Sequence, residues 1–327
     1  MNITAIRIHE NGKPSVMKRE RVELGEPGRE EILVRHTAIG FNMIDTYVRS
    51  GLYPSPPKPC GLGGEAAGVV EAAGKSVKEF KPGDRVVYAF GTPPGAYSEA
   101  RVMGTNFVLK LPNWIADTTA AAILTKGRTV EYLFNRTTKL KSGQTILFHA
   151  AAGGVGLLAG QWAKAIGVRA IGVVSTEEKA KLAKRNGYYR VIISKKQDIA
   201  KEVMALTKGK GVDVVYDSVG KDTWQASLDS ARLRGLVVSF GSASGNPAPF
   251  EVAAEGLKKS VYIHRATMVN YMTDPDIAAA SARKVFSMLK AGAIKPNVDT
   301  SYRLKDIVKL HRDAEARKTS GQIVMLP

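Results

Sequence analysis

The stretch HAAAGGVG, residues 149–156, constrains the fold of this chain more than any other segment. It follows the apolar run TILF and opens a run with helical periodicity at 154–167, so it joins a strand to a helix through a tight turn. Gly153 and Gly156 stand at the second and third positions of a dinucleotide-binding fingerprint, and Gly154 adds room for phosphate. Ala151 holds the first position, which requires only a tight turn without a strongly positive φ. The segment therefore predicts a dinucleotide at the N-terminus of the helix.

A regular alternation of strands and helices surrounds this turn between Lys141 and Gly241. Five apolar segments with strand character are separated by helices of ordinary length, which predicts a doubly wound parallel sheet of the Rossmann type in an α/β protein. VYIHRATM at 261–268 is a plausible sixth strand, and an amphipathic helix is expected at 276–291. The expected strands are 145–150, 168–175, 190–194, 211–219 and 235–241.

The flanking parts of the chain have a different texture. The first 120 or so residues contain short β-rich runs divided by glycine and proline, followed by a helix-forming run at 114–136 with Asp117 as a candidate N-cap. The C-terminal tail resembles the N-terminal region more than the alternating one. We therefore expect a β-rich catalytic domain formed by 1–124 and 267–327, with a Rossmann domain inserted at 125–266.

Composition limits the possible classes of function. The chain of 327 residues has one cysteine, Cys60, and a net charge of +18, and it lacks an apolar run long enough to span a membrane. The N-terminal MNITAIRIHENGK has no apolar segment typical of a secretion signal, so we expect a cytoplasmic protein. The positive charge suits RNA, an anionic surface or an anionic small molecule.

The end of the second expected strand favours NADPH over NADH. An acidic residue there would bind the 2′-hydroxyl of the adenosine ribose, but this chain has Ser175 and Thr176, with Lys179 one turn into the next helix. No carboxylate at this position repels a 2′-phosphate, and a cation lies within reach. Glu177 and Glu178 are equally explained by the dipole at a helix start.

The sequence lacks the zinc ligands that a zinc alcohol dehydrogenase needs. Such a site needs cysteine and histidine ligands, but Cys60 stands alone and the segment where a Gly-His-Glu motif would fall has Gly63, Gly64 and Glu65. The five histidines are scattered, and we expect them to be packing or surface residues; we expect no metal. Without a Lewis acid, a quinone or conjugated enone is the favoured hydride acceptor, because the incoming charge spreads over the conjugated system.

Six motifs together closely resemble the NADPH-dependent quinone oxidoreductases of the zeta-crystallin group, which are zinc-free members of the medium-chain dehydrogenase/reductase superfamily. The resemblance extends from the first strand to Pro327. It implies a GroES-like catalytic domain, a Rossmann domain, a homodimer formed through Rossmann sheet edges, and hydride transfer in a cleft between the domains. The motifs are AIGFNMIDTYVRSGLYP (38–54), GDRVVYA (83–89), GAYSE (95–99), HAAAGGVGLLAGQWAKAIG (149–167), VVYDSVGKDTW (214–224) and VSFGSASG (238–245).

The resemblance also implies site residues. Asn42, Asp45 and Tyr53 would line the nicotinamide and quinone pocket, with Asn42 and Tyr53 orienting the acceptor; the alternative is that Asn42 caps a helix and Tyr53 is a loop aromatic. Cofactor contacts are implied for Lys126, Thr129, Gly154, Val155, Ser218, Phe240, Gly241, Ser242 and Arg317. A tyrosine that often packs by the 2′-phosphate is replaced here by Ser194, with Arg185, Lys195 or Lys196 as possible substitutes.

Two other functions compete with quinone reduction. An NADPH-dependent alkenal or enone reductase would share the scaffold and the hydride chemistry, and the sequence of the pocket does not separate the two. RNA binding is disfavoured as the main function, because the basic residues are not interleaved with stacking aromatic side chains. As a secondary property, RNA binding stays open.

Overall fold

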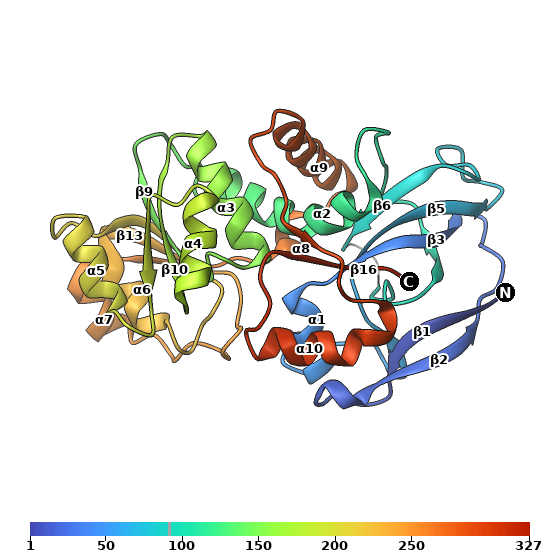
Figure 1. Cartoon of the computed structure of the whole chain (residues 1–327), viewed down its shortest axis with the longest axis horizontal. Helices are drawn as coiled ribbons and strands as arrows, with labels where there is room; N and C mark the ends of the chain where they lie inside the picture. The colour runs from blue at the N-terminus through green and yellow to red at the C-terminus, as the bar shows by residue number, and fades with distance from the viewer. Residues whose placement is uncertain (91–92) are drawn as a thin grey trace. The chain divides into compact units, whose positions relative to one another are not determined.

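The computed structural model describes residues 1–90 and 93–327, which group into two units (Figure 1). Unit 1 consists of Met1–Arg128, Met272–Val285 and Pro296–Pro327, and unit 2 consists of Thr129–Tyr271 and Phe286–Lys295. Two helices, α2 (Asp117–Glu131) and α9 (Pro275–Lys290), contribute residues to both units. The domain limits expected from the sequence, 1–124 with 267–327 and 125–266, stay a prediction.

Unit 2 contains a six-stranded parallel sheet in the order β11-β10-β9-β12-β13-β14. The chain moves from β9 outward to β11 and then returns to β12 on the other side of β9. Because crossovers between parallel strands are right-handed, this reversal places α3 and α4 on one face of the sheet and α5 and α6 on the other. The doubly wound sheet and its sixth strand are confirmed. The strands are β9 (Thr145–Phe148), β10 (Arg169–Val174), β11 (Arg190–Ile193), β12 (Val212–Asp217), β13 (Ala231–Ser239) and β14 (Tyr262–Arg265).

One expected helix of unit 2 extends further than the observed one, and the observed helices at Val252–Lys259 and Met268–Tyr271 were not expected. The run DTWQASLDSARLR reads as helical through Arg234, but the helix ends at Ser230 and the strand β13 begins at Ala231. Alanine, leucine and arginine favour helices, and pairing of Ala231 with Val212 of β12 overrides that preference. The helices are α3 (Gly154–Ala165), α4 (Glu177–Arg185), α5 (Ile199–Leu206), α6 (Trp224–Ser230), α7 (Val252–Lys259) and α8 (Met268–Tyr271), with a π-helix at Tyr132–Thr137 after α2.

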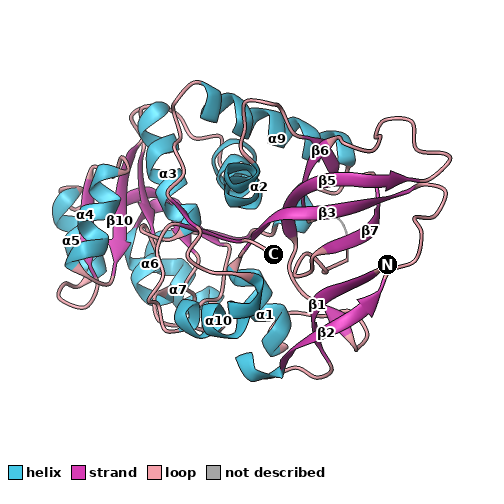
Figure 2. Ribbon diagram, turned by 45° about the vertical axis from the view of Figure 1, so that its right-hand side comes forward, coloured by secondary structure: helices cyan, strands magenta, loops and turns pink. Residues whose placement is uncertain are grey.

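Unit 1 is built on two sheets. The long strands β3 and β5 of the larger sheet are visible in Figure 2. The larger sheet has the order β15-β16-β3-β5-β6-β8, with β7 also paired to β3, and the smaller one has the order β2-β1-β4. The C-terminal strand β16 pairs antiparallel with the end of β3, so the tail completes the sheet begun by the N-terminal region. The strands are β1 (Asn2–Ile8), β2 (Met17–Glu23), β3 (Glu31–Gly40), β4 (Cys60–Gly61), β5 (Glu65–Ala73), β6 (Arg85–Ala89), β7 (Ala100–Gly104), β8 (Val108–Lys110), β15 (Val298–Asp299) and β16 (Gln322–Met325).

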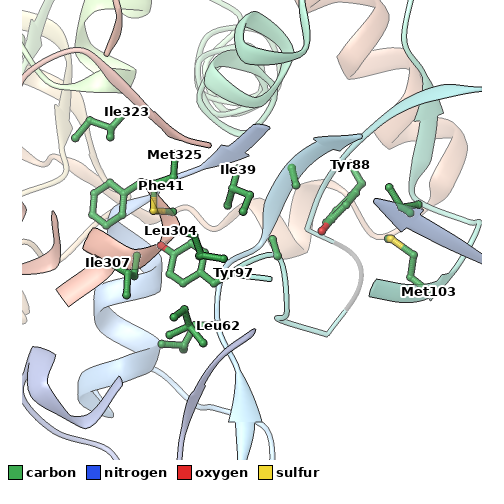
Figure 3. Close-up of a cluster of buried hydrophobic side chains, with 14 of the residues drawn as sticks. Ile39, Phe41, Leu62, Tyr88, Tyr97, Met103, Leu304, Ile307, Ile323 and Met325 are labelled. Atoms are coloured by element: carbon green, nitrogen blue, oxygen red, sulfur yellow. The ribbon is translucent and has the colours of Figure 1, made fainter. Parts of the chain in front are cut away.

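Two helices of unit 1 cover its core, α1 (Met43–Ser50) and α10 (Ile307–Glu315), and short 3₁₀ turns occur at Pro14–Val16 and Leu304–Asp306. Side chains from β3, β6, β16 and α10 pack with Tyr97 in one apolar cluster (Figure 3). Helix α1 has only eight residues, too few for a clear helical periodicity in the sequence. The only sign of this helix in the sequence was Asn42 as a possible cap. Among residues 1–90 and 93–327, no helix is both long and apolar enough to cross a membrane.

The start of α2 corrects one expectation. Asp117 is the first residue of the helix and not its N-cap. Its carboxylate accepts hydrogen bonds from the Thr37 hydroxyl at 2.6 Å and from Arg85 Nε at 3.0 Å. These hydrogen bonds connect α2 to β3 and β6. The Asp117 side chain therefore joins the helix to the sheet, whereas the sequence predicts that it caps the helix.

Candidate functional site

The turn at 149–156 connects β9 to α3, and its backbone conformation allows alanine at the first position of the fingerprint. Ala151 is fully buried and its amide donates to the Val173 carbonyl of β10 at 3.0 Å. The residue in the left-handed region is its neighbour Ala150, with φ of 53°, while Ala151 is not among the residues with positive φ. The expectation that the first fingerprint position needs no positive φ is confirmed.

The glycines of the turn are required for two different reasons. A Cβ on Gly156 would lie 2.4 Å from the Ala150 carbonyl oxygen, so only glycine allows α3 to pack this close to the turn. A Cβ on Gly153 would meet a single atom, the same oxygen, at 3.2 Å, and would otherwise extend into open space. That space, in front of the N-terminus of α3, is where a phosphate group would approach the backbone.

The turn is also held from the neighbouring strand. A Cβ on Gly172 of β10 would lie 2.7 Å from the Ala151 methyl group and 2.8 Å from the Tyr188 ring. The buried Tyr188 hydroxyl donates a hydrogen bond to the Gly156 carbonyl at 2.7 Å. The volume that a first glycine would leave open is therefore filled by the methyl group of Ala151, and Gly172 provides the necessary room.

The residues expected near the adenosine lie at the carboxyl ends of β10 and β11. Thr176 is the N-cap of α4, and its hydroxyl accepts the Lys179 amide at 3.3 Å. Ser194 follows β11, and its amide and hydroxyl both donate to the Val174 carbonyl. Ser175 is partly buried and directly precedes Thr176, so Ser175, Thr176, Lys179 and Ser194 follow the carboxyl ends of two paired strands. Lys196 is paired with Glu177 at 2.9 Å.

A buried carboxylate organises the end of β12. Asp217 accepts hydrogen bonds from the amides of Val219 and Gly220 and from the hydroxyls of Thr223 and Ser227, at 2.7 to 3.0 Å. Burial raises the pKa of this carboxyl, but the hydrogen bonds from Ser227, Gly220 and Thr223 oppose burial, and the pKa is lowered. The ionised carboxylate fixes the DSVG turn that carries Ser218.

His149 joins this network from the first strand of the sheet. Its Nε2 lies 3.0 Å from the Ser227 hydroxyl, which already donates its proton to Asp217. Since a hydroxyl has one proton, Ser227 must accept from His149, and the proton of the neutral ring is therefore on Nε2. Burial lowers the pKa of His149, with the Asp217 carboxylate opposing it, so the ring is neutral near pH 7. The expectation of a packing histidine agrees with this position.

The loop after β13 approaches the DSVG turn closely. A Cβ on Gly241 would lie 2.6 Å from the Ser218 carbonyl oxygen, so glycine is required where the two turns meet. Phe240 packs against Phe148 with ring centroids 5.6 Å apart, and Ser242, two residues after Phe240, is buried. The predicted residues Ser218, Phe240, Gly241 and Ser242 thus lie on two turns that meet at the carboxyl edge of the sheet.

A second polar cluster lies in unit 1 around Asn42. The Asn42 side chain accepts a hydrogen bond from Lys126 Nζ at 2.9 Å and donates one to Glu65 Oε2 at 2.8 Å. Lys126 Nζ is 3.4 Å from the same carboxylate oxygen, and the Thr125 amide donates to the other oxygen at 2.7 Å. Asn42 also occupies the N-cap position of α1. Because its side chain is hydrogen-bonded to Lys126 and Glu65 on other elements, the capping alternative alone does not account for this residue.

Asp45 lies next to this cluster on the first turn of α1. Its carboxylate accepts the Asn42 backbone amide at 2.9 Å and the Tyr97 hydroxyl at 2.7 Å. Burial raises the pKa of Asp45 to about 7, and the hydrogen bonds and Lys126 only partly oppose this effect. His311 of α10 faces the Tyr97 hydroxyl at 3.4 Å, and burial lowers the pKa of this ring to about 3. Asp45 is thus an acid buried in the core of unit 1.

Three other predicted residues lie outside these two groups. Tyr53 follows α1 and packs against Tyr47, with ring centroids 5.1 Å apart. Thr129 is one helical turn after Lys126 on α2 and belongs to unit 2. Arg317 is exposed just after α10, in the left-handed region with φ of 58°.

The described residues contain no group of three or more His, Cys, Asp or Glu side chains arranged to hold a metal ion. The donor set near Asn42 is one amide, one carboxylate and one ammonium, and an ammonium repels a cation. This set suits hydrogen bonding to a ligand oxygen and not metal coordination.

Comparisons with known proteins agree with the two-unit architecture. Residues 28–113 match the alcohol dehydrogenase GroES-like domain, and residues 154–283 match the zinc-binding dehydrogenase family. A quinone oxidoreductase of Pseudomonas aeruginosa is 47% identical over 316 residues, which cover 97% of each chain. The chain belongs to the quinone oxidoreductase family. Its fold is the GroES-like and Rossmann combination of that family, as expected.

Two further members of this comparison are informative about ligands. The structure of Escherichia coli quinone oxidoreductase complexed with NADPH is similar with a TM-score of 0.95 and 43% identity, covering 99% of this chain and all of that one. A 2-haloacrylate reductase from Burkholderia is 40% identical, covering 99% of both chains. Proteins named quinone oxidoreductase and 2-haloacrylate reductase are therefore both similar to this chain over nearly its whole length.

The sequence interpretation missed Glu65, Tyr97 and Asp217 as organisers of the site. Glu65 was considered only as the neighbour of an absent histidine ligand. Its partners Asn42 and Lys126 are 23 and 61 residues away in the chain, so no local pattern reveals the contact. The signal that could have found it is a charged residue opening an otherwise apolar strand, EAAGVV, where a buried charge demands a partner.

Replacing Gly172 by alanine tests the packing of the turn. The added methyl group would overlap the Ala151 methyl and the Tyr188 ring, so we expect a loss of about 1–3 kcal/mol in the free energy of unfolding. Urea unfolding followed by circular dichroism measures it. Gly256→Ala in α7 is the control, because no atom lies within 4 Å of its Cβ and alanine favours a helix. Equal stability of the two variants would contradict the packing argument.

Asp45 predicts a pH-dependent stability with a defined sign. Because its pKa is raised from 3.8 to about 7, the folded state binds more protons than the unfolded state in that window, and rising pH destabilises the fold. Asp45→Asn keeps an acceptor for Tyr97 and removes the titration. We expect the stability of this variant relative to the wild type to increase between pH 5 and pH 8, by about 1–3 kcal/mol.

The measurement is the melting temperature of both proteins across this pH range. Asp84→Asn serves as the control, since contact with Lys110 lowers the pKa of Asp84 below its ordinary value and out of the window. Its difference from the wild type should stay constant between pH 5 and pH 8. Parallel curves for Asp45→Asn and the wild type would contradict the raised pKa.

Proposed function

We propose that the protein is an NADPH:quinone oxidoreductase that transfers hydride to a quinone without a metal. The observation that carries the proposal is a glycine-rich strand-to-helix turn at the switch point of a Rossmann sheet, in a chain 47% identical to a quinone oxidoreductase over nearly its whole length. When bound, NADPH supplies the hydride. The quinone gains that hydride and one proton from solvent, and the products are hydroquinone and NADP⁺.

The residues of unit 2 fit the cofactor along the carboxyl edge of the sheet. Gly153, Gly154, Val155 and Gly156 would hold the pyrophosphate, and the open space at Gly153 supports this assignment. The 2′-phosphate would lie by Ser175, Thr176, Lys179 and Ser194, where hydroxyls and an ammonium replace the acidic residue of NAD-dependent proteins. The proposed contacts to the ribose and nicotinamide are Ser218, Phe240, Gly241 and Ser242. Further proposed contacts to the cofactor are Lys126, Thr129 and Arg317.

Asn42, Asp45 and Tyr53 are the proposed acceptor residues. A neutral amide in a buried polar cluster can donate a hydrogen bond to a carbonyl oxygen without losing its proton. A quinone needs no stronger electrophile, because the developing charge is shared across its ring. Asp45 contributes by holding the start of α1 through the Asn42 backbone amide, and Tyr53 would orient the acceptor.

Reduction of a conjugated alkenal or enone is the second candidate. It is favoured by the 40% identity to a 2-haloacrylate reductase, whose substrate also carries a carbon–carbon double bond conjugated to a carbonyl group. The same hydride chemistry serves both acceptors. The location in the cytoplasm and any secondary binding of RNA stay predictions from the sequence.

A panel of acceptors tests the proposed function. We expect NADPH oxidation with 1,4-benzoquinone and 1,2-naphthoquinone, measured as the loss of NADPH absorbance. We also expect a KM for NADPH at least about tenfold below that for NADH, because of the charge-assisted contacts to the 2′-phosphate. Turnover of an alkenal without turnover of either quinone would favour the second candidate. A preference for NADH would contradict the cofactor assignment.

We also propose a homodimer formed through the outer edge of β14. This strand ends the sheet of unit 2, and among the described residues it pairs only with β13. Its apolar side chains Tyr262 and Ile263 are 64% and 40% exposed, which is unusual for an unprotected edge strand. A second copy would extend the sheet across this edge and cover both side chains.

Sedimentation of an edge variant tests the dimer. Tyr262→Asp should convert a dimer into a monomer, since a charge would be buried in the interface. Tyr189→Asp is the matched control, because Tyr189 is 53% exposed next to the strand at the opposite end of the sheet. A monomeric wild type, or dissociation of both variants alike, would contradict the proposal.

A further inference from the structure

The Asn42 amide lies between a buried cation and a buried anion that come from different elements. Lys126 is on α2 and Glu65 opens β5, while Asn42 immediately precedes α1. The exposed fractions of Lys126, Glu65 and Asn42 are 5%, 0% and 6%, so water does not screen these contacts. The side chain of Asn42 is thus held by two charges whose signs are fixed.

The signs of these charges determine the orientation of the amide. An ammonium group only donates hydrogen bonds and a carboxylate only accepts them, so Oδ1 of Asn42 must face Lys126 and Nδ2 must face Glu65. The usual ambiguity between the oxygen and nitrogen of an asparagine therefore does not arise here. One N–H of Nδ2 is used by Glu65, and the second N–H has no acceptor among the described residues.

Glu65 itself cannot turn away from Asn42. Its Oε1 accepts the Thr125 amide at 2.7 Å, which leaves Oε2 for Asn42 and Lys126. A Cβ on Gly40 would lie 2.6 Å from Oε2, so β3 packs directly against the carboxylate. A buried ion pair contributes little net stability, because desolvation offsets the attraction between the charges. Geometry is therefore a better explanation of this pair than stability.

We propose that Glu65 and Lys126 are positioning residues that fix the Asn42 amide so that its second N–H donates to the carbonyl oxygen of the acceptor. The proposal rests on the proposed function only in the identity of that acceptor. Negative charge grows on this oxygen as hydride arrives, and a donor held in advance stabilises it without reorganisation. Reversing the amide would present a lone pair to the same oxygen and repel it.

Glu65→Gln tests the orientation with a minimal change of shape. The Thr125 amide needs the oxygen of the new side chain, so the new NH₂ group would face Asn42 Nδ2 and Lys126, and three donors would meet. The amide of Asn42 must then leave its orientation. We expect kcat with 1,4-benzoquinone to fall about a hundredfold, the loss typical of one oxyanion donor, with the KM for NADPH changed less than about threefold.

The double variant Asn42→Asp with Glu65→Gln separates positioning from stability. The carboxylate introduced at position 42 accepts hydrogen bonds from Lys126 and from the NH₂ group introduced at position 65. This exchange restores the hydrogen bonds of position 42 with Lys126 and position 65 and the net charge of the cluster. It loses only the 3.4 Å contact of Lys126 with position 65, and it leaves no N–H for the acceptor. We expect the melting temperature of the double variant to return to the wild-type value while kcat stays low. Recovery of kcat together with stability would overturn the proposal.

Glu99→Gln is the control for the loss of a partly buried carboxylate in unit 1. Glu99 accepts the Thr4 amide at 2.7 Å and makes no contact with the cluster around Asn42 among the hydrogen bonds of the described residues. We expect this variant to leave kcat with 1,4-benzoquinone unchanged. A hundredfold loss in this variant as well would show that kcat responds to any such substitution, and it would overturn the positioning role.

A measurement without turnover keeps the inference separate from the proposed activity. In protein labelled with ¹⁵N-asparagine, one side-chain proton of Asn42 should be protected from exchange by Glu65, and Glu65→Gln should remove that protection. Adding 1,4-naphthoquinone without NADPH should shift the second proton downfield. Two rapidly exchanging protons in the wild type would overturn the orientation, whereas a wild type that reduces no quinone but keeps one protected proton would overturn only the proposed function.

Discussion

Each unit of this protein places one buried carboxylate at the end of a central strand, and the need to satisfy that charge organises the loops around it. Glu65 opens β5 in unit 1, and Asp217 closes β12 in unit 2. A buried carboxylate left without donors would cost several kcal/mol, so surrounding segments can adopt only arrangements that direct N–H and O–H groups at it. The loops that carry the candidate residues are among those segments.

The two carboxylates are satisfied in different ways. Asp217 draws on the amides and hydroxyls of its own turn and of α6, all within ten residues, and reaches His149 through Ser227. Glu65 instead depends on residues far apart in the chain, with a charged partner in Lys126. The first network makes a rigid local turn, while the second connects α1, α2 and β5 in one centre.

This difference explains what the sequence could predict. Strand and helix alternation follows from local periodicity, so the doubly wound sheet, its sixth strand and the turn at HAAAGGVG were accessible. The handedness of the crossovers does not fix the order of the strands, but once the order is known it fixes which face of the sheet each helix covers. Contacts such as Asn42 with Lys126 depend on the tertiary packing of separate elements, and no periodicity encodes them. The role of Lys126 was expected from resemblance alone, and the role of Glu65 was missed. Local errors have a related origin. Thr37 on β3 and Arg85 on β6 bind the Asp117 carboxylate in place of a local cap, and strand pairing with β12 overrides the helical composition of 231–234.

The pairing of Ala151 with Gly172 has a consequence for recognising such turns in other chains. The first fingerprint position is a limit on the combined volume of two residues, one in the turn and one in the adjacent strand, and glycine can occupy either of them. A relative with glycine in the turn could place alanine in the strand only where the residue at the position of Tyr188 also leaves room, so these positions should vary together. A search pattern that counts glycines along one segment overlooks this exchange, whereas one that scores the pair across β9 and β10 retains it.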